Sequence, residues 1–374
     1  MKFALIRIAK EEFKNKNLII ENLPNNKVKF WYKERGLGPN PFILPKYLEL
    51  DEKLSEAIGI YCGDGKLTKN DLTHTALSTI DEDIAKFVFE FFRYDLDVNP
   101  EFFRLDIIYR KDNPRKLKEK WSRILKMLKR KLHVMYSNRH RNDVLQIQIG
   151  GIILRKIFQK LITLSLPAIR REPILRQAFL RGHFAADGGI AIYKDVYRKY
   201  ISEITFNYNP INEMWLRDYL LECLKLEKVK NIAVREYGTT AYLSISNWGN
   251  YLKLWSMKLF DRSERKKNKF LEVVANMKVY VDLKDTFRKN LFNSINLTQN
   301  EIAKIIDSWQ GNVCKTIQGK HLLNLEQIHS LLKLSKKDWL EVISNTEKIR
   351  IGQLTELNKN ETFLNFVLEQ KKLI

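Results

Sequence analysis

The sequence of this protein is organised around LSEAIGIYCGDG, residues Leu54–Gly65. Apolar positions run most of the way round a helix here, so we expect a buried helix, capped at its start by Asp51. Gly59 and Gly63 lie one turn apart on one face of that helix, and Asp64 follows directly. By itself this pattern is also typical of an ordinary buried helix that ends in an Asp-Gly turn.

A second stretch, LRQAFLRGHFAADG at Leu175–Gly188, repeats the pattern. Gly182 and Ala186 repeat the spacing of the small residues, and Asp187 repeats the terminal acid 123 positions further on. A separation of that size is about one small domain, which indicates a duplicated unit. We interpret His183, inside this stretch, as a packed helix histidine rather than a catalytic group.

The elements expected after the two motifs follow a similar order. After the first come a strand at 73–80, a helix capped by Asp81, a strand at 102–110, a basic helix at 115–131, a strand at 144–150 and a helix to about 162. After the second come a strand at 197–207, a helix opened by Pro210, a hairpin at 230–246 and a helix at 247–259. An ordered series recurs by chance far less often than a short motif, so the order favours duplication.

The composition points to a folded, intracellular protein, and nucleic acid is the leading candidate for its partner, although many basic proteins are merely basic. The chain has 374 residues, of which 44% are hydrophobic, enough for several domains with buried cores. A net charge of +22 favours a polyanionic partner. The three cysteines, Cys62, Cys223 and Cys314, lie far apart and suggest reduced thiols rather than a zinc site. Because we find no membrane-spanning run and no secretory signal, we expect a soluble protein of the cytoplasm or an organellar matrix, with no membrane partner.

We divide the chain into a leader at 1–46, a first repeat at 47–167, a second repeat at 168–290 and a helical extension at 291–374. A linker is expected at 167–173, between two prolines. The leader interleaves cations with aromatic rings, a composition suited to phosphates and stacked bases, although a half-buried strand explains it as well. These residues are Lys27, Lys29, Trp31, Tyr32, Lys33 and Arg35.

The extension contains a run of short helical patterns at 297–335. Thr298 is expected to cap a helix that runs to Ile306, a second helix lies at 312–317, and a third begins near Asn324. This resembles a helix-turn-helix, whose second helix can enter a major groove, although many three-helix units bind nothing. We expect a final helix within 344–374 and assign it no role.

The paired motifs predict a site for hydrolysis. Two helices with small residues on facing sides can pack with their backbones close, which would bring Asp64 and Asp187 together at their ends. Two carboxylates in a partly dehydrated cleft are costly unless a divalent cation neutralises them. Mg²⁺ suits such a pair, and a metal placed there can activate water and stabilise the leaving oxygen of a phosphodiester.

With AIGIYCGDG and FLRGHFAADG as two copies of the motif, the sequence resembles the LAGLIDADG homing endonucleases in their single-chain form, over about residues 45–270. The resemblance implies an α+β fold of two pseudo-symmetric αββαββα subdomains with antiparallel, saddle-shaped sheets. It also implies a monomer that uses Mg²⁺ or Mn²⁺ to make a staggered double-strand break in a long duplex DNA target.

The resemblance assigns roles to individual residues. Asp64 and Asp187 are expected to be catalytic and to bind metal, with help from the backbone carbonyls of Gly63 and Ala186. Lys266 and Lys267 are further catalytic candidates near the scissile phosphates. The small residues expected at the helix interface are Gly59, Gly63, Gly182 and Ala186.

Side chains on the strands and near the late helix are candidates for contacting DNA, since hydrogen-bonding groups on a sheet can read a groove once the strand register is set. The candidates are Arg104, Arg110, Gln146, Gln148, Arg198, Arg235 and Arg262.

Two alternatives stay open. The same fold serves as an RNA-splicing maturase and as a DNA-binding regulator, so the chain is alternatively a catalytically silent binder, with structured intron RNA as a further partner. The layout resembles a bacterial regulator type that joins this fold to a helix-turn-helix, but that type has generally lost the two acids that this chain keeps. The second alternative is a structural or protein-binding module without affinity for nucleic acid.

Overall fold

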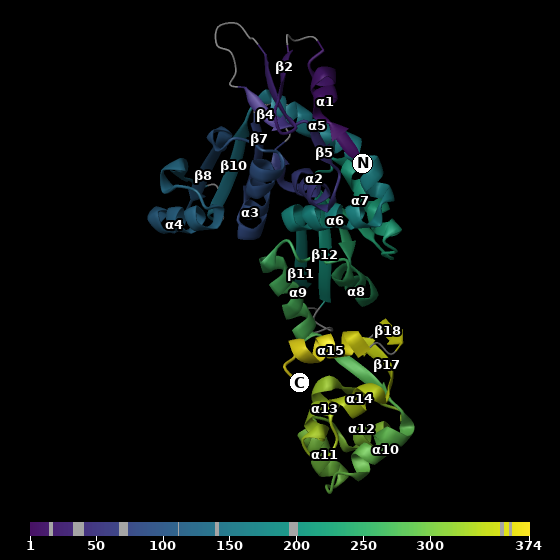
Figure 1. The fold of residues 1–374 in the computed structure, drawn as a ribbon. Coiled ribbons are helices and arrows are strands. Elements are labelled where there is room, and N and C mark those ends of the chain that lie inside the picture. Colours follow the sequence, from purple (N-terminus) through teal and green to yellow (C-terminus); the bar gives the residue numbers. More distant parts are fainter. Residues whose placement is uncertain are drawn as a thin grey trace. The chain divides into compact units, whose positions relative to one another are not determined.

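The computed structural model describes residues 1–14, 18–32, 41–66, 74–110, 112–138, 142–193, 201–351, 355–358 and 361–374 (Figure 1). The chain divides into two compact units. The first consists of Met1–Gly189, Ile204–Ser244 and Leu254–Lys267, and the second of Ile190–Glu203, Ile245–Lys253 and Asn268–Ile374. In the described chain, no helix combines the length and the apolar character that a membrane crossing requires.

The first motif forms α2 (Glu52–Asp64), and Asp51 caps it as predicted, accepting the backbone N–H of Leu54 at 2.8 Å. The strands of the first repeat form one sheet in the order β6-β7-β10-β8-β9. Neighbouring strands are antiparallel, except for β8 and β9, which are parallel. The strands are β6 (Gly65–Lys66), β7 (His74–Thr79), β8 (Phe103–Tyr109), β9 (Leu132–Tyr136) and β10 (Val144–Gly150).

Helices α3 (Glu82–Glu90) and α5 (Ile152–Arg171) pack against this sheet, and α4 (Pro114–Leu125) lies beside β8 and β9 (Figure 1). The buried face of β10 carries aliphatic side chains that alternate with half-buried glutamines, as expected for a sheet with one face in the core. Aromatic rings fill the space between α2 and α5, where the Tyr61 and Phe158 ring centroids lie 4.9 Å apart.

The second motif forms α6 (Pro173–Asp187), and the second repeat has the sheet order β11-β12-β14-β13, which matches β6-β7-β10-β8. The predicted α+β fold with two αββαββα repeats is therefore confirmed. The remaining elements are β11 (Gly188–Tyr193), β12 (Ile201–Tyr208), α7 (Met214–Leu226), β13 (Ala233–Tyr237), β14 (Thr240–Ile245) and α8 (Trp248–Ser256).

Three predicted boundaries in the repeats are wrong. The basic helix expected at 115–131 ends at Leu125, where Lys126 adopts a left-handed conformation, and Lys129–Lys131 form a separate 3-10 turn. Residues 167–173 are not a linker, because α5 continues through Pro167 to Arg171 and Pro173 opens α6, where a missing N–H costs nothing. The helix expected from Pro210 begins only at Met214. Before it, the Asn209 side chain accepts the N–H of Ile211 at 2.9 Å, and such an Asx turn delays the start of the helix.

Residues 1–46 contain regular structure. A helix, α1 (Leu5–Glu12), packs on α5, and β1 (Lys2–Ala4) pairs with β5 (Tyr47–Glu49). The basic and aromatic stretch is mainly a strand, in which Lys29 pairs with Glu21 at 3.2 Å and Lys27 pairs with Asp97. Lys33 and Arg35 lie outside the described residues. The strands β2 (Leu18–Leu23), β3 (Lys27–Tyr32) and β4 (Phe42–Pro45) form one sheet in that order.

The second unit contains the three short helices predicted in the extension, α11 (Gln299–Ile305), α12 (Gln310–Ile317) and α13 (Leu325–Leu332). Thr298 caps α11 as predicted. The extension is not purely helical, because β17 (Thr346–Ile351) and β18 (Thr355–Asn358) precede the last helix, α15 (Glu361–Gln370). They belong to a sheet in the order β16-β15-β17-β18. The other elements are α9 (Glu264–Asn276), β15 (Val279–Leu283), α10 (Asp285–Asn293), β16 (Leu323–Asn324) and α14 (Trp339–Ser344).

The sequence pattern that would predict these strands covers only a few residues. Along β15, buried Val279, Val281 and Leu283 alternate with more exposed residues, a period of two that five residues display only weakly. The division of the chain into four segments at 46, 167 and 290 stays a prediction.

Candidate active site

The two motif helices, α2 and α6, touch backbone to backbone. A Cβ atom added to Gly59 would lie 2.1 Å from the carbonyl oxygen of Phe179, and one added to Gly182 would lie 2.1 Å from that of Glu56. Only glycine allows this approach, and the two contacts are reciprocal, as small-residue helix packing requires.

The C-terminal ends of α2 and α6 also meet. A Cβ on Gly63 would lie 2.9 Å from Cβ of Ala186 and 3.1 Å from Cβ of Asp187. The four residues predicted at the helix interface therefore lie in it. Asp64 and Asp187 are the last residues of the two helices, so the packing places both acids at one end of the pair.

Burial makes both acids hard to ionise, and the charge of Asp187 adds to this effect at Asp64. Burial, reinforced by the charge of Asp187, raises the pKa of Asp64 to about 7. Burial raises the pKa of Asp187 to about 6, although Asn207 Nδ2 donates to its Oδ1 at 3.4 Å and opposes the shift. Each helix also ends here with its negative dipole end. The arrangement favours a cation.

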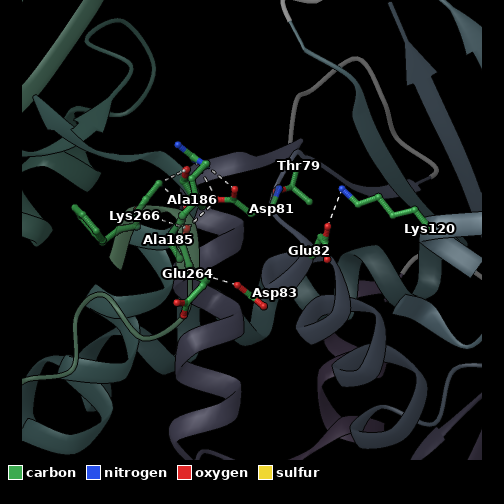
Figure 2. Close-up of polar contacts among 12 residues, drawn as sticks. Thr79, Asp81, Glu82, Asp83, Lys120, Ala185, Ala186, Glu264 and Lys266 are labelled. Atoms are coloured by element: carbon green, nitrogen blue, oxygen red, sulfur yellow. Dashed lines mark hydrogen bonds and ion pairs between the residues drawn. The ribbon is translucent and has the colours of Figure 1, made fainter. Parts of the chain in front are cut away.

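Lys266 supplies one cation from the protein itself. Its Nζ donates to the carbonyl oxygens of Phe184, Ala185 and Ala186 at 2.7, 2.6 and 3.1 Å (Figure 2). The residue is only 5% exposed, and burial lowers the pKa of its ammonium group to about 8 despite the nearby Asp64 charge. Lys266 thus satisfies the last carbonyls of α6, including the Ala186 carbonyl that is predicted to coordinate metal.

A network on Asp81 positions Lys266. Arg265 donates through Nε and Nη2 to Asp81 at 2.7 and 3.1 Å, and Ser263 Oγ donates to Asp81 Oδ2 at 2.9 Å. The N–H of Glu264 donates to Asp83 Oδ2 at 3.0 Å, so the start of α9 is held on the start of α3 (Figure 2).

The prediction that Asp81 caps α3 is wrong as to its side chain. It occupies the cap position without a side-chain cap hydrogen bond, because its carboxylate binds Arg265 and Ser263 instead. Sequence reasoning missed these partners, which lie more than 180 positions away. We find no local pattern that signals them.

The buried Glu56 carboxylate joins the two motif helices, in addition to their glycine contacts. Glu56 is 2% exposed, and it accepts a hydrogen bond from Arg181 Nη2 at 3.1 Å and from Arg262 Nη2 at 3.3 Å. The Arg262 guanidinium also lies 4.1 Å from the Phe87 ring centroid. Arg262, a candidate for DNA contact, therefore binds the helix pair. The signal for Glu56 is a charged residue within an apolar helix, which predicts a buried partner.

Lys267 lies apart from these contacts. Its Nζ pairs with Asp261 Oδ1 at 3.0 Å, and the two side chains are partly accessible to water, at 31% for Lys267 and 44% for Asp261. The two neighbouring lysines that are predicted together therefore have different surroundings, and only Lys266 contacts a motif helix.

His183 packs within the core. It is 0% exposed, burial lowers the pKa of its imidazole to about 3, and its ring stacks 6.5 Å from Phe179 and 6.0 Å from Phe206 between centroids. Among the residues that the structure describes, neither ring nitrogen has a hydrogen-bond partner. This placement agrees with a neutral packing histidine.

Three of the DNA-contact candidates lie on one face of the first sheet. Arg104 on β8 lies opposite Gln148 on β10, and Gln146 lies opposite Asp106. The buried Asp106 carboxylate accepts from Arg104 Nε at 3.1 Å and from Gln148 Nε2 at 3.5 Å, which holds these side chains in place. The result is a fixed polar face.

The other candidates are dispersed. Arg110 follows β8, where its N–H donates to Asp143 Oδ1 at 2.6 Å, and Arg235 is exposed on β13. Arg198 lies outside the described residues. The contact of these side chains with DNA stays a prediction.

The donors at the helix ends suit a hard cation that keeps some of its water. Within the described ranges, no group of three or more His, Cys, Asp or Glu side chains is placed to hold a metal ion. Two carboxylates fit Mg²⁺, which typically binds through one or two carboxylates together with water and substrate phosphate. Asp64, Asp187 and the carbonyl of Gly63 fit that role. The carbonyl of Ala186 fits less well because it already accepts from Lys266.

No family profile and no curated protein matches this chain. Among solved structures, the chain is similar to full-length DUF199/WhiA from Thermatoga maritima, with 14% identity, 77% of this chain and 93% of that chain covered, and a TM-score of 0.36. It is similar to the N-terminal LAGLIDADG domain of DUF199/WhiA, with 15% identity, coverage of 56% and 81%, and a TM-score of 0.36.

A third similar structure is the I-LtrWI LAGLIDADG homing endonuclease bound to target DNA, with 11% identity, coverage of 60% and 89%, and a TM-score of 0.32. At these identities and TM-scores the similarity concerns the fold and does not extend to an activity. The solved structures to which this chain is similar thus include LAGLIDADG proteins.

Proposed function

We propose that this chain is a metal-dependent, site-specific DNA endonuclease of the homing type. The observation that carries the proposal is the placement of Asp64 and Asp187 at the adjoining ends of α2 and α6, where both acids have raised pKa values. Raised pKa values at a shared polar site are typical of functional carboxylates.

The residues at the helix ends have different proposed roles. Asp64 and Asp187 hold the cation, which when bound supplies activation of water and stabilisation of the leaving oxygen. Mg²⁺ is the proposed ion, and Mn²⁺ is the substitute. The carboxylates keep a negatively charged phosphodiester away until a cation is present, because like charges repel in a partly dehydrated site. Lys266 adds a positive charge beside α6 that is fixed by three carbonyls.

Duplex DNA is the proposed partner, and the chain is proposed to act as a monomer with internal two-fold pseudo-symmetry. A net charge of +22 supplies attraction to phosphates, and the polar face with Arg104, Gln146 and Gln148 supplies hydrogen-bonding groups for a groove.

The test is cleavage of a library of long duplex targets in the presence of Mg²⁺. We expect double-strand breaks from the wild type and none from Asp64→Asn with Asp187→Asn. Asp112→Asn, which changes an exposed acid on the same unit, is the matched control and should cut normally. Cutting by the double variant would overturn the assignment of the two acids.

One observation favours the silent nucleic-acid binder as a second candidate. Lys266 already occupies the Ala186 carbonyl with a protein cation, so the second motif's end is partly neutralised without metal. This candidate predicts salt-dependent binding of duplex DNA or structured intron RNA and no cleavage with Mg²⁺ or Mn²⁺. Negligible binding of both nucleic acids would contradict both candidates and favour a protein-binding module.

A further inference from the structure

The two repeats differ by one insertion. In the first repeat, α4 and β9 lie between β8 and β10, whereas in the second repeat β13 passes directly into β14 through a tight turn at Gly238. The first sheet therefore has an added edge strand, β9, parallel to β8, that has no counterpart beside β13.

The insertion is a packed part of the fold. Leu117, Trp121 and Leu125 are buried and recur every fourth residue, so they form the apolar stripe of α4 that contacts β8 and β9. The helix also contacts α3, and its remaining side carries exposed residues. The insertion is thus a rigid platform and can present side chains at fixed positions.

The surface of this platform is strongly basic. Between residues 115 and 131 the sequence has nine Lys or Arg and one Glu. Lys120, Lys129 and Lys131 pair with Glu82, Glu119 and Glu101.

Five other cations of the platform are exposed, and within the part of the chain that the structure describes none of them forms an ion pair. These are Arg115, Lys116, Arg123, Lys126 and Arg130. A rigid surface with five uncompensated charges has a polyanion as its natural partner.

The platform adds an edge strand to the sheet that carries three of the DNA-contact candidates, while α4 itself packs beside α3, β8 and β9. Strand β9 is next to β8, which carries Arg104, and it is four strands from β6, which starts directly after Asp64. At about 4.8 Å per strand, β9 lies roughly 19 Å along the sheet from β6. This length corresponds to about five or six base pairs at 3.4 Å each.

We propose that the α4–β9 insertion binds the phosphate backbone of duplex DNA and extends the bound segment on the side of the first repeat only. The inference rests on the proposed DNA binding. It adds a surface, and an asymmetry of the bound DNA, that the paired motifs do not imply. The cations act on phosphates and leave the reading of bases to other residues, since charge contacts position a duplex without specifying its sequence.

The test compares two triple variants that remove the same charge. Arg115, Lys116 and Arg123 are changed to Gln in the first, and Lys10, Lys14 and Lys225, exposed elsewhere on the first unit, are changed to Gln in the control. Gln keeps the helix propensity of Lys and Arg. The probe is a long, fluorescently labelled DNA duplex of random sequence, titrated at several salt concentrations.

We expect the platform variant to lower the slope of log K against log salt by about 2 to 3, because each lost phosphate contact removes about 0.9. We expect the control variant to change that slope by less than about 0.9, which is one contact. Equal thermal unfolding midpoints of the two variants and the wild type would show that only surface charge has changed.

The possible failures are distinguishable. Wild-type binding with equal slopes for the two variants would overturn the insertion's role and leave the proposed function standing. No duplex binding by the wild type would overturn both. A slope change seen with duplex RNA but not with duplex DNA would assign the platform to RNA and overturn the inference. On a cleavable target, hydroxyl-radical protection should extend further on one side, and the platform variant should lose that extension.

Discussion

The first and second repeats share their order of elements and strands, but the ends of their motif helices differ. At the end of α6, Lys266 donates to three carbonyls, including that of Ala186. At the end of α2, no side chain of the described residues donates to the carbonyl of Gly63. Duplication therefore accounts for the shared scaffold, while the charge at the site is distributed unequally.

This difference teaches that a symmetric scaffold need not give two equivalent half-sites. Lys266 satisfies carbonyl groups at one helix end only, although its charge also acts on Asp64 at the other end. The contact between the motifs is likewise unequal, because the first supplies an acid, Glu56, and the second supplies Arg181.

The largest expected effect comes from breaking that unequal contact. Glu56→Ala leaves the guanidinium groups of Arg181 and Arg262 without their buried partner. Removing one member of a buried ion pair typically costs about 3 to 5 kcal/mol, so we expect a loss of that size in the free energy of unfolding. Chemical denaturation measures it.

The control for this variant is Glu52→Ala on the same helix. Glu52 is largely exposed and lies 3.6 Å from Arg181, so its loss should cost less than about 1 kcal/mol. Equal losses for the two glutamates would show that burial of Glu56 does not stabilise the helix pair.

The symmetric part of the contact is tested by Gly59→Ala and Gly182→Ala. Each added Cβ would lie 2.1 Å from a backbone oxygen of the facing helix, so the helices must separate. We expect each change to cost about 2 to 3 kcal/mol, with similar values because the contacts are reciprocal.

Gly311→Ala on α12 is the matched control for the glycines. No atom lies within 4 Å of a Cβ placed there, so alanine should be neutral or stabilise by up to about 1 kcal/mol. Tolerance of alanine at both Gly59 and Gly182 would contradict the close approach of α2 and α6.

The sequence predicted well the features that the two repeats share, and it predicted poorly the contacts in which they differ. Small residues at a helical spacing and an order of strands are local signals, so the helix pair and the two acids followed from them. The contacts of Lys266 with α6 and of Arg265 with Asp81 join residues about 80 and 184 positions apart. Any of the many surface cations could have made them, so spacing alone could not select these.

The helix and strand boundaries failed for related reasons. Prolines at 167 and 173 suggested a break, but one is accommodated inside α5 and the other opens α6. The strands at 346–358 are short, and tertiary pairing with β15 decides their structure rather than local propensity.

The inequality of the helix ends is tested by Lys266→Met. The change leaves three carbonyls of α6 without their donor, and we expect a loss of about 2 kcal/mol in the free energy of unfolding. It also frees the Ala186 carbonyl, so Mn²⁺ binding followed by electron paramagnetic resonance should become tighter than in the wild type.

Lys267→Met is the control, since that partly exposed lysine forms an ion pair with Asp261 and a distant ring contact with Trp255, and its change should alter stability by less than about 1 kcal/mol. Weaker Mn²⁺ binding after Lys266→Met would mean that Lys266 does not compete with the metal for α6.

The smallest expected effect is a pH dependence that the two acids share. The pKa of Asp64 is about 7 and that of Asp187 about 6 in the folded protein, against an ordinary value of 3.8 for both. Between about pH 4 and pH 7 the folded protein therefore binds more protons than the unfolded chain, and the free energy of unfolding falls as the pH rises. Asn at both positions removes this decline.

Each full unit of pKa shift corresponds to about 1.4 kcal/mol, and the two shifts are about 3 and about 2 units, so the double variant should exceed the wild type at pH 8 by at least about 1 to 2 kcal/mol even after screening by water. The two proteins should be equally stable near pH 2, where both acids are protonated whether the chain is folded or unfolded. Mg²⁺ at pH 8 should stabilise the wild type and leave the variant unchanged, because only the wild type keeps the carboxylates that bind it. A stability difference that does not vary with pH would mean that neither burial nor repulsion raises the pKa values of these acids, and the need for a cation there would disappear with it.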